Sequence, residues 1–199
     1  MVSFQLRNTL IPSFQSLAAR LAQRPRLESR DPRPAAAIAA ILIPDPLSVL
    51  LIRRSEREGD PWSGHVALPG GREEPEDSDL IATAIRETAE EVGILLDRSE
   101  LLGTLDDVTP RSIVKPPFMV RPFVFGLGSE PRLQLSSEVA SAHWEPLETL
   151  MRAEARGELP LTIAGVTRRF PSYQTTAGTL WGMTERVLSG VLRELKGES

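Results

Sequence analysis

The stretch Pro69–Ile94, PGGREEPEDSDLIATAIRETAEEVGI, decides the fold of this chain and its candidate site. A double glycine is followed by a long segment without glycine or proline. Ser78 or Asp79 can cap the start of a helix there, and Gly93 stands where a helix commonly ends. We therefore predict a helix over Ser78–Val92.

The predicted helix has an apolar side and an acidic side. At about 100° per residue, Ile81, Ile85 and Val92 share one face with Thr88. We expect the first three to pack on a sheet. Three carboxylates are expected on the opposite face: those of Glu87, Glu90 and Glu91.

These carboxylates are unfavourable as a group, because like charges at this spacing repel and the C-terminal end of a helix favours cations. One interpretation is an acidic helix surface that faces water. The other is a divalent cation among the glutamates, with a carbonyl oxygen of Gly70 or Gly71 close by, since glycine lets the backbone approach an ion. Such a set of hard oxygen atoms suits Mg²⁺ or Mn²⁺.

The spacing of these residues resembles the Nudix box, G-x5-E-x7-R-E-U-x-E-E-x-G-U, in which U is aliphatic. The residues that match are Gly71, Arg86, Glu87, Glu90, Glu91, Gly93 and Ile94. Thr88 replaces an aliphatic residue, the segment from Gly71 to Arg86 is one residue longer than usual, and Ser78 stands where the box has glutamate. Asp77 is the expected substitute for that glutamate, and Glu74 and Glu76 are alternatives.

The resemblance implies a hydrolase that uses water to cleave the diphosphate of a nucleoside diphosphate derivative. It implies that Glu87, Glu90 and Glu91 hold Mg²⁺ or Mn²⁺, with the Gly70 carbonyl as a further ligand. Arg86 would then orient the glutamates through a bidentate pair. For the base that activates water, Glu87 is the first candidate, and Glu138, in the stretch SSEVASAHWEPL, is the second.

The preceding stretch, LLIRRSEREGDPWSGHVALPGG, resembles the coenzyme A pyrophosphatase branch of the family. The matching residues are Leu50, Leu51, Arg54, Ser55, Gly64, Pro69, Gly70 and Gly71. Gly59 stands where that branch has an arginine, and Arg53, Arg54 and Arg57 are candidates to replace the charge of that arginine. We predict Arg53, Arg54, Ser55 and Gly71 as substrate-binding residues. Trp62 is interpreted as packing at the edge of the core, with a lid that contacts a base or a pantetheine chain as the alternative, and His65 is interpreted as structural.

Periodicity elsewhere predicts further elements and one fold class. Helices are expected near Phe14–Leu21, over 145–157 and over Trp181–Leu195. Strands are expected over 36–43, 48–53, 101–105, 118–127 and 140–144. Interleaved strands and helices indicate an α/β (α+β) protein, and the resemblance implies a Nudix-type α/β/α sandwich with a mixed β-sheet. Residues 1–34 are expected to form an N-terminal helix and a proline-rich linker, and 35–199 the Nudix domain with its C-terminal helix.

Composition limits the partners of the chain. Its 199 residues carry a net charge of −4 and no cysteine, which argues against broad nucleic-acid binding, disulfides and thiol catalysis. We see neither a secretory signal nor an apolar run long enough for a membrane span, and we expect a cytoplasmic protein that binds no membrane. The resemblance also suggests a homodimer.

The resulting hypothesis is metal-dependent hydrolysis of coenzyme A or its derivatives to 3′,5′-ADP and 4′-phosphopantetheine. Another pyrophosphate substrate is the first alternative: ADP-ribose, a dinucleotide or a nucleoside triphosphate. The second alternative is a Nudix-fold binding protein without catalysis.

Overall fold

The computed structural model describes residues 12–27, 35–59, 62–109, 118–163 and 165–197. Part of the predicted linker, residues 28–34, lies outside these ranges. The larger sheet contains β1 (Ala35–Pro44), β2 (Leu47–Arg54), β3 (Val66–Ala67), β4 (Gly70–Arg72), β5 (Leu101–Thr104), β6 (Met119–Gly126) and β7 (Val139–Pro146). All five strands expected from the sequence are present, whereas β3 and β4 are too short for a periodicity to reveal them.

The larger sheet is mixed, as predicted. Strand β1 runs parallel to β6, and the other pairings are antiparallel. One edge of β1 is shared by two partners, because β4 pairs with Ala36–Ile38 and β2 pairs with Leu42–Pro44. The strand β4 therefore enters the sheet beside the start of β1, which is where the double glycine lies.

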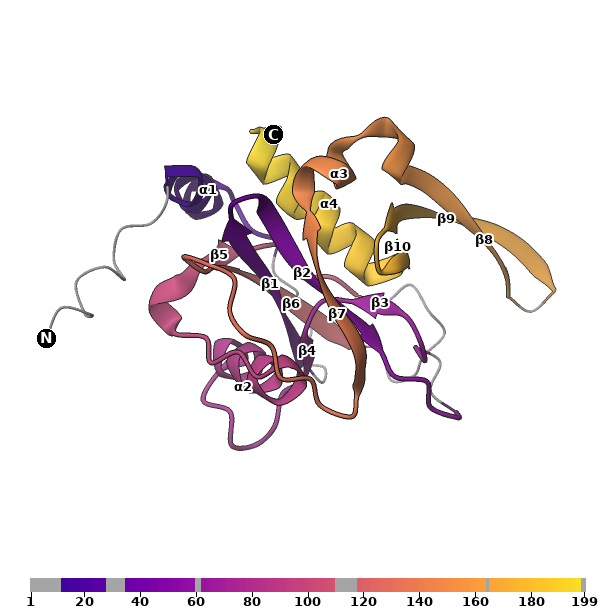
Figure 1. Ribbon diagram of the computed structural model, residues 1–199, viewed down its shortest axis with the longest axis horizontal. Coiled ribbons are helices and arrows are strands. Elements are labelled where there is room, and N and C mark those ends of the chain that lie inside the picture. Colours follow the sequence, from indigo (N-terminus) through magenta and orange to yellow (C-terminus); the bar gives the residue numbers. More distant parts are fainter. Residues whose placement is uncertain (1–11, 28–34, 60–61, 110–117, 164, 198–199) are drawn as a thin grey trace, which may run out of the picture.

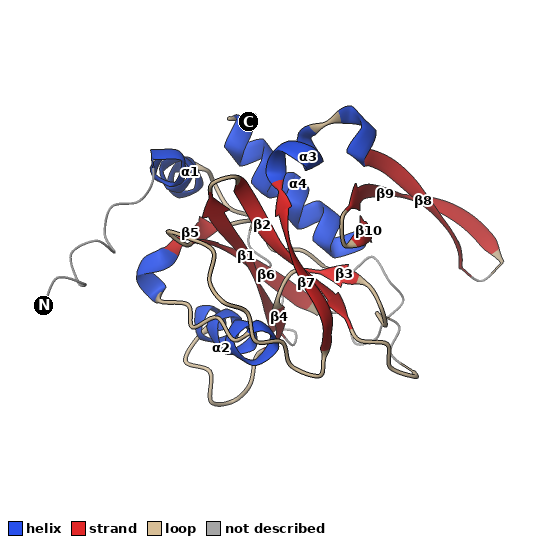
Figure 2. Ribbon diagram, in the orientation of Figure 1, coloured by secondary structure: helices blue, strands red, loops and turns tan. Residues whose placement is uncertain are grey.

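Helices cover both faces of this sheet (Figures 1 and 2). The helix α2 (Leu80–Val92) packs on one face, and α1 (Pro12–Gln23) and α4 (Gly182–Lys196) lie on the other. Alternate residues of β1 serve the two cores, with Ala39 and Ile41 toward α2 and Ala40 and Leu42 toward α1 and α4. The expected α/β/α arrangement is confirmed. None of the helices in the described ranges is long and apolar enough to cross a membrane.

The expected helix over 145–157 is largely wrong. Only α3 (Leu147–Met151) and a short 3₁₀ turn (Ala153–Ala155) are helical, and Glu145 ends β7. The chain then forms a second sheet from β8 (Arg156–Ile163), β9 (Val166–Thr175) and β10 (Gly178–Trp181), whose β8–β9 hairpin extends away from the body (Figure 1). Leu147 and Leu150 are fully buried, so the apolar spacing that suggested a long helix belongs to a single turn.

The N-terminal helix α1 is part of the core. Phe14 and Leu17 are at most 1% exposed, and Leu21 is also buried. The strands leave room for them through glycine: a Cβ at Gly126 would lie 2.7 Å from the Phe14 ring, and one at Gly103 would lie 2.6 Å from Cβ of Leu21. The two glycines thus allow α1 to pack closely on the sheet.

We predict that Phe14→Ala lowers the free energy of unfolding by about 3–5 kcal/mol, because it removes a buried ring from a close-packed site. Denaturant unfolding of the full chain measures this. Leu95→Ala, at a leucine that is 85% exposed, is the control and should change stability little. Equal effects of the two variants would mean that α1 does not contribute to the domain's stability.

Candidate active site

The strand β4 lies where sheet and helix α2 meet, and its two glycines allow this contact. A Cβ at Gly70 would lie 2.3 Å from the Ala37 carbonyl oxygen, so β1 could not approach as closely. A Cβ at Gly71 would lie 2.2 Å from Oε1 of Glu87. Any side chain at either position would therefore displace β1 or the carboxylate of α2.

The helix α2 begins and ends close to where the sequence predicts. Asp79 caps it, since its side chain accepts a hydrogen bond from the Ala82 N–H at 2.8 Å, and Gly93 ends it in the left-handed region. Thr88 lies on the buried side, as expected, and donates its hydroxyl hydrogen to the Ala84 carbonyl at 2.7 Å. This satisfied hydroxyl explains how a threonine occupies an otherwise aliphatic position.

One glutamate was assigned to the wrong side of the helix. Glu91 is only 4% exposed, whereas the sequence placed it on the face opposite the core. The Gly70 N–H donates a hydrogen bond to its Oε2 at 2.9 Å, which supplies a polar partner inside the packed region. Burial raises the pKa of Glu91 to about 7 in spite of this bond, and the nearby charges of Glu87 and Glu138 add to the rise.

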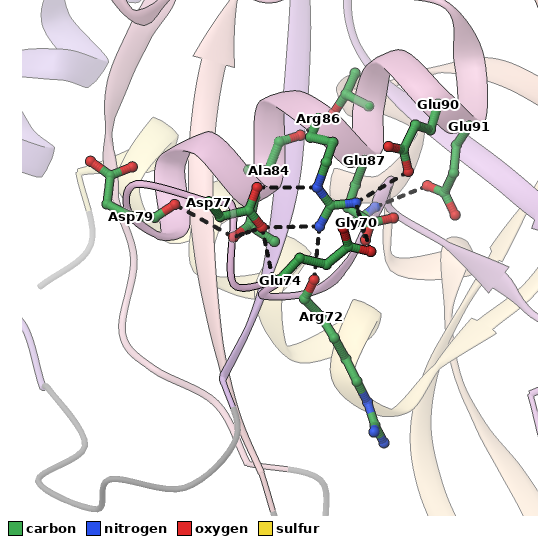
Figure 3. A network of polar contacts seen from close by, with 12 residues as sticks. Gly70, Arg72, Glu74, Asp77, Asp79, Ala84, Arg86, Glu87, Glu90 and Glu91 are labelled. Atoms are coloured by element: carbon green, nitrogen blue, oxygen red, sulfur yellow. Dashed lines mark hydrogen bonds and ion pairs between the residues drawn. The ribbon is translucent and has the colours of Figure 1, made fainter.

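Arg86 holds the carboxylates together (Figure 3). Its Nε and Nη2 bind the two oxygens of Asp77 at 3.1 and 3.0 Å, and its Nη2 also donates to the Arg72 carbonyl at 2.9 Å. The third nitrogen, Nη1, donates to Glu87 at 3.0 Å and to Glu90 at 3.1 Å. The bidentate partner of Arg86 is thus Asp77, the residue expected to replace the family glutamate, and the glutamates receive single bonds.

The two glutamates bound by Arg86 differ in their exposure to solvent. Glu90 is exposed, while burial against the sheet raises the pKa of Glu87 and Arg86 opposes that rise. Within the described ranges, no three acidic or histidine side chains are already positioned as a metal site. Arg86 Nη1 occupies the space between Glu87 and Glu90, and the group that Gly70 turns toward Glu91 is its N–H.

The residues predicted from the upstream stretch separate into two groups. Ser55 binds the segment before β7, because its N–H donates to the Glu138 carbonyl at 2.8 Å and its hydroxyl to the Ser137 carbonyl at 2.9 Å. Glu138 is half-exposed and pairs with Arg57 at 3.2 Å. Arg54 and Gly71 line a pocket, whereas Arg53 is exposed and is not among the described lining residues.

This pocket has a volume of about 650 Å³ and borders β4, a size typical of small-molecule sites. Its lining includes aromatic rings from distant parts of the chain: Trp62, His65, Phe118, Phe170 and Trp181. Arg54, Arg72 and Arg186 line it as well. Gly70 and Gly71 are common to the pocket and to the carboxylate group, so the two meet at a pair of residues without side chains.

Sequence reasoning missed several of these pocket residues. Phe170 lies on the unpredicted strand β9, Trp181 was read only as the start of a helix, and Arg72 was one of the unassigned positions in the glycine loop. His65 was interpreted as structural, and packing was the preferred interpretation of Trp62 over a lid that contacts the substrate, yet both residues line the pocket. An aromatic residue beside a glycine, as in Trp181–Gly182, is too weak a signal to have found them.

Comparison with known proteins decides the family. A NUDIX domain model matches residues 32–170. The chain belongs to the Nudix family.

Several known proteins are similar to this chain over different lengths. An uncharacterized NudL of Citrobacter koseri is 33% identical over 164 residues, which cover 79% of this chain and 80% of that protein. Mouse mitochondrial coenzyme A diphosphatase NUDT8 is 36% identical over 86 residues, covering 43% and 41%. An uncharacterized protein of Schizosaccharomyces pombe is 44% identical over 118 residues, which span 57% of this chain and 36% of that protein.

Among solved structures, a MutT/nudix family protein from Enterococcus faecalis is similar in fold. Its TM-score is 0.55 at 19% identity, and the match covers 88% of this chain and 71% of that one. This similarity supports the Nudix fold alone.

We predict that Gly71→Ala impairs the Nudix site while leaving the fold stable. The new methyl group would meet the end of the flexible Glu87 side chain, which can move at a cost of about 1 kcal/mol or less. The displaced carboxylate should lower turnover about a hundredfold. Thermal unfolding and turnover are measured together, with Gly128→Ala, where a Cβ meets nothing within 4 Å, as the control. Turnover equal to that of the control would contradict the prediction.

A second prediction concerns Asp77, whose pKa is lowered from 3.8 to about 2, mainly by its hydrogen bonds from Arg86. A lowered folded-state pKa stabilises the protein above the unfolded pKa, and this contribution disappears as the pH falls toward the folded value. Asp77→Asn should lower the free energy of unfolding by about 1.5–3 kcal/mol near pH 7. The difference from wild type should shrink between pH 4 and pH 2.

Denaturant unfolding across this pH range checks the Asp77 prediction. Glu76→Gln, at an exposed neighbour, is the matched control and should have little effect at any pH. A destabilisation by Asp77→Asn that is independent of pH would mean that the Arg86 pair is not its cause.

Proposed function

We propose that this Nudix hydrolase is a pyrophosphohydrolase that uses Mg²⁺ or Mn²⁺ to cleave coenzyme A or its derivatives into 3′,5′-ADP and 4′-phosphopantetheine. The observation that carries the proposal is the position of Gly70 and Gly71 between the α2 carboxylates and the pocket. A diphosphate at this strand would have its reacting phosphorus beside the carboxylates while the rest of the molecule occupies the pocket.

The residues of α2 suit a hard divalent cation. Glu87, Glu90 and Glu91 offer oxygen donors. Burial raises the pKa of Glu91 although the Gly70 N–H and the charge of Arg54 lower it, so a cation beside this carboxylate would stabilise its charged form. In the proposal these three side chains hold the cation, with the Gly70 carbonyl as a further ligand. Such a cation neutralises the diphosphate and stabilises the negative charge that develops on it.

Arg86 would prepare the glutamates for this role. Asp77 and the Arg72 carbonyl hold two of its nitrogens, so only Nη1 remains for Glu87 and Glu90. Those two carboxylates can turn from Nη1 toward a cation without disturbing the bidentate pair. Arg86 is therefore a positioning residue in this mechanism.

Two carboxylates remain candidates for activating the attacking water. Glu87 is favoured because it is partly buried against Gly71, directly beside the pocket strand. Glu138 is half-exposed and pairs with Arg57. Glu138→Gln distinguishes them. If Glu138 is the base, the variant lowers kcat and removes one ionisation from its pH profile; if Glu138 forms only an exposed ion pair, the variant has little effect.

The preference for coenzyme A rests on the motif around Arg54 and Ser55 and on the similarity to NudL proteins and to mouse NUDT8, which is named a coenzyme A diphosphatase. Other pyrophosphates stay the alternative substrates, because Gly59 replaces an arginine of the coenzyme A motif and because the match to NUDT8 covers only part of each chain. A cytoplasmic location and a homodimer stay predictions. The mouse relative is named mitochondrial, and native mass measurement tests the dimer.

The test is a product assay with Mg²⁺ and with Mn²⁺ on coenzyme A, ADP-ribose, NADH, diadenosine polyphosphates and nucleoside triphosphates. We expect 3′,5′-ADP from coenzyme A, and no product after the metal is removed with EDTA. Cleavage of a different substrate alone would refute the coenzyme A assignment, and no cleavage of any would favour a binding protein.

Glu90→Gln tests the metal assignment. Glu90 is exposed and its substitution preserves shape, so the fold should be retained while turnover falls at least about a hundredfold. Binding of Mn²⁺, followed by electron paramagnetic resonance, should weaken in parallel. Glu76→Gln is the matched control. Unchanged turnover and unchanged Mn²⁺ binding in Glu90→Gln would refute the assignment.

A further inference from the structure

We infer that the pocket beside β4 binds the adenine nucleotide half of the substrate, with Arg72 as the residue that recognises the phosphate on the ribose 3′ position. This inference rests on the proposed function, because it assigns the two halves of a coenzyme A-type substrate to places in the same site. It concerns residues outside those predicted from the sequence.

The side chain of Arg72 points away from the carboxylates (Figure 3). Its backbone is fixed, since it pairs with Ala36 of β1 and its carbonyl accepts a hydrogen bond from Arg86. Its guanidinium lies over the ring of Phe118, with 5.6 Å between the guanidinium carbon and the ring centroid. Among the described residues no ion pair joins it to a carboxylate.

This direction decides which phosphate Arg72 meets. The diphosphate must reach the glutamates of α2, on one side of the glycine strand. Arg72 lines the pocket with its side chain directed away from those glutamates, and we therefore assign to it a separate phosphate on the same molecule. A guanidinium binds phosphate through two parallel hydrogen bonds, and the 3′-phosphate of an adenine nucleotide supplies such a group.

The aromatic rings of the pocket suit the base. Trp181 is held by two neighbours, His65 at 5.2 Å between ring centroids with a 61° angle and Phe170 at 5.8 Å with 57°. These tilted contacts fix its orientation, and it lines the pocket. A fixed indole offers a stacking surface to a flat heterocycle. The pantetheine arm is a flexible chain of amides without a flat ring, so the stacking surface of Trp181 favours the base.

The test measures binding to the full chain by calorimetry in EDTA, so that no cation at α2 contributes. The probes are adenosine 3′,5′-bisphosphate, 5′-AMP and 4′-phosphopantetheine. We expect the bisphosphate to bind about tenfold to a hundredfold more tightly than 5′-AMP, as charge-assisted hydrogen bonds allow. Arg72→Ala should remove this preference, and Arg72→Lys should restore part of it.

Two further variants sharpen the result. Arg168→Ala, at an exposed arginine of β9, should leave the preference intact. Trp181→Ala should weaken both nucleotides equally, and Trp181→Phe should recover most of the affinity. The inference is overturned by equal binding of the two nucleotides to wild type, by a preference that survives in Arg72→Ala, or by pocket binding of 4′-phosphopantetheine alone.

Kinetics separate this inference from the proposed function. With coenzyme A and its 3′-dephospho form as substrates, Arg72→Ala should raise KM for coenzyme A alone and leave kcat similar, whereas Glu90→Gln lowers kcat for both. A wild-type chain that cleaves neither substrate but still prefers the bisphosphate through Arg72 would refute the proposed function and support the pocket assignment. Cleavage of coenzyme A with an unchanged KM in Arg72→Ala would support the proposed function and refute the assignment of the pocket.

Discussion

The site depends on the close approach of two backbones, β4 and β1, and one carboxylate at Gly70–Gly71. At Gly70 the space for a side chain is occupied by β1, and at Gly71 it is occupied by the carboxylate of Glu87. Because neither glycine carries a side chain, β4 can pair with β1, contact the Glu87 side chain of α2 and line the pocket at the same time. The Gly70 N–H then fixes Glu91 inside the packed region, so that sheet register and carboxylate position are set by the same strand.

The electrostatics of α2 follow from this packing. One guanidinium, that of Arg86, is shared among Asp77, Glu87 and Glu90, while Glu91 accepts a hydrogen bond from the backbone N–H of Gly70. Negative charge therefore exceeds positive charge beside the glycine strand, in a place that is partly withdrawn from water. The opposite charge balance prevails in the pocket, where three arginines are among the lining residues. Under the proposed function, cations at the carboxylates would let an anionic substrate extend from one to the other.

Much of this could be predicted from the sequence, for reasons that differ among the elements. The helix α2 has a cap, an uninterrupted interior and a terminal glycine, and β1 is a continuous apolar run, so local signals sufficed. Glu91 was misplaced because it was grouped with Glu87 and Glu90 by charge. It lies seven residues after the buried Ala84, which puts it on the same side of the helix, and the Gly70 N–H that binds it there is 21 residues away in the chain. The β8–β9 hairpin was missed because its strands are largely exposed, and exposed strands lack the alternation on which prediction depends.

Under the proposed function, the residues predicted from the sequence carry out the reaction, and the residues that were missed recognise the rest of the substrate. The carboxylates act on a diphosphate, which every substrate of this kind contains, and they lie within residues 32–170 that match the NUDIX model. Trp181 and α4 follow that range in the chain, and Phe170 is its last residue. Reaction chemistry thus resides in a compact motif that can be read locally. Recognition of the attached group is assembled by tertiary packing from β4, β9 and the end of β10, so substitutions there can alter the substrate without disturbing the carboxylates.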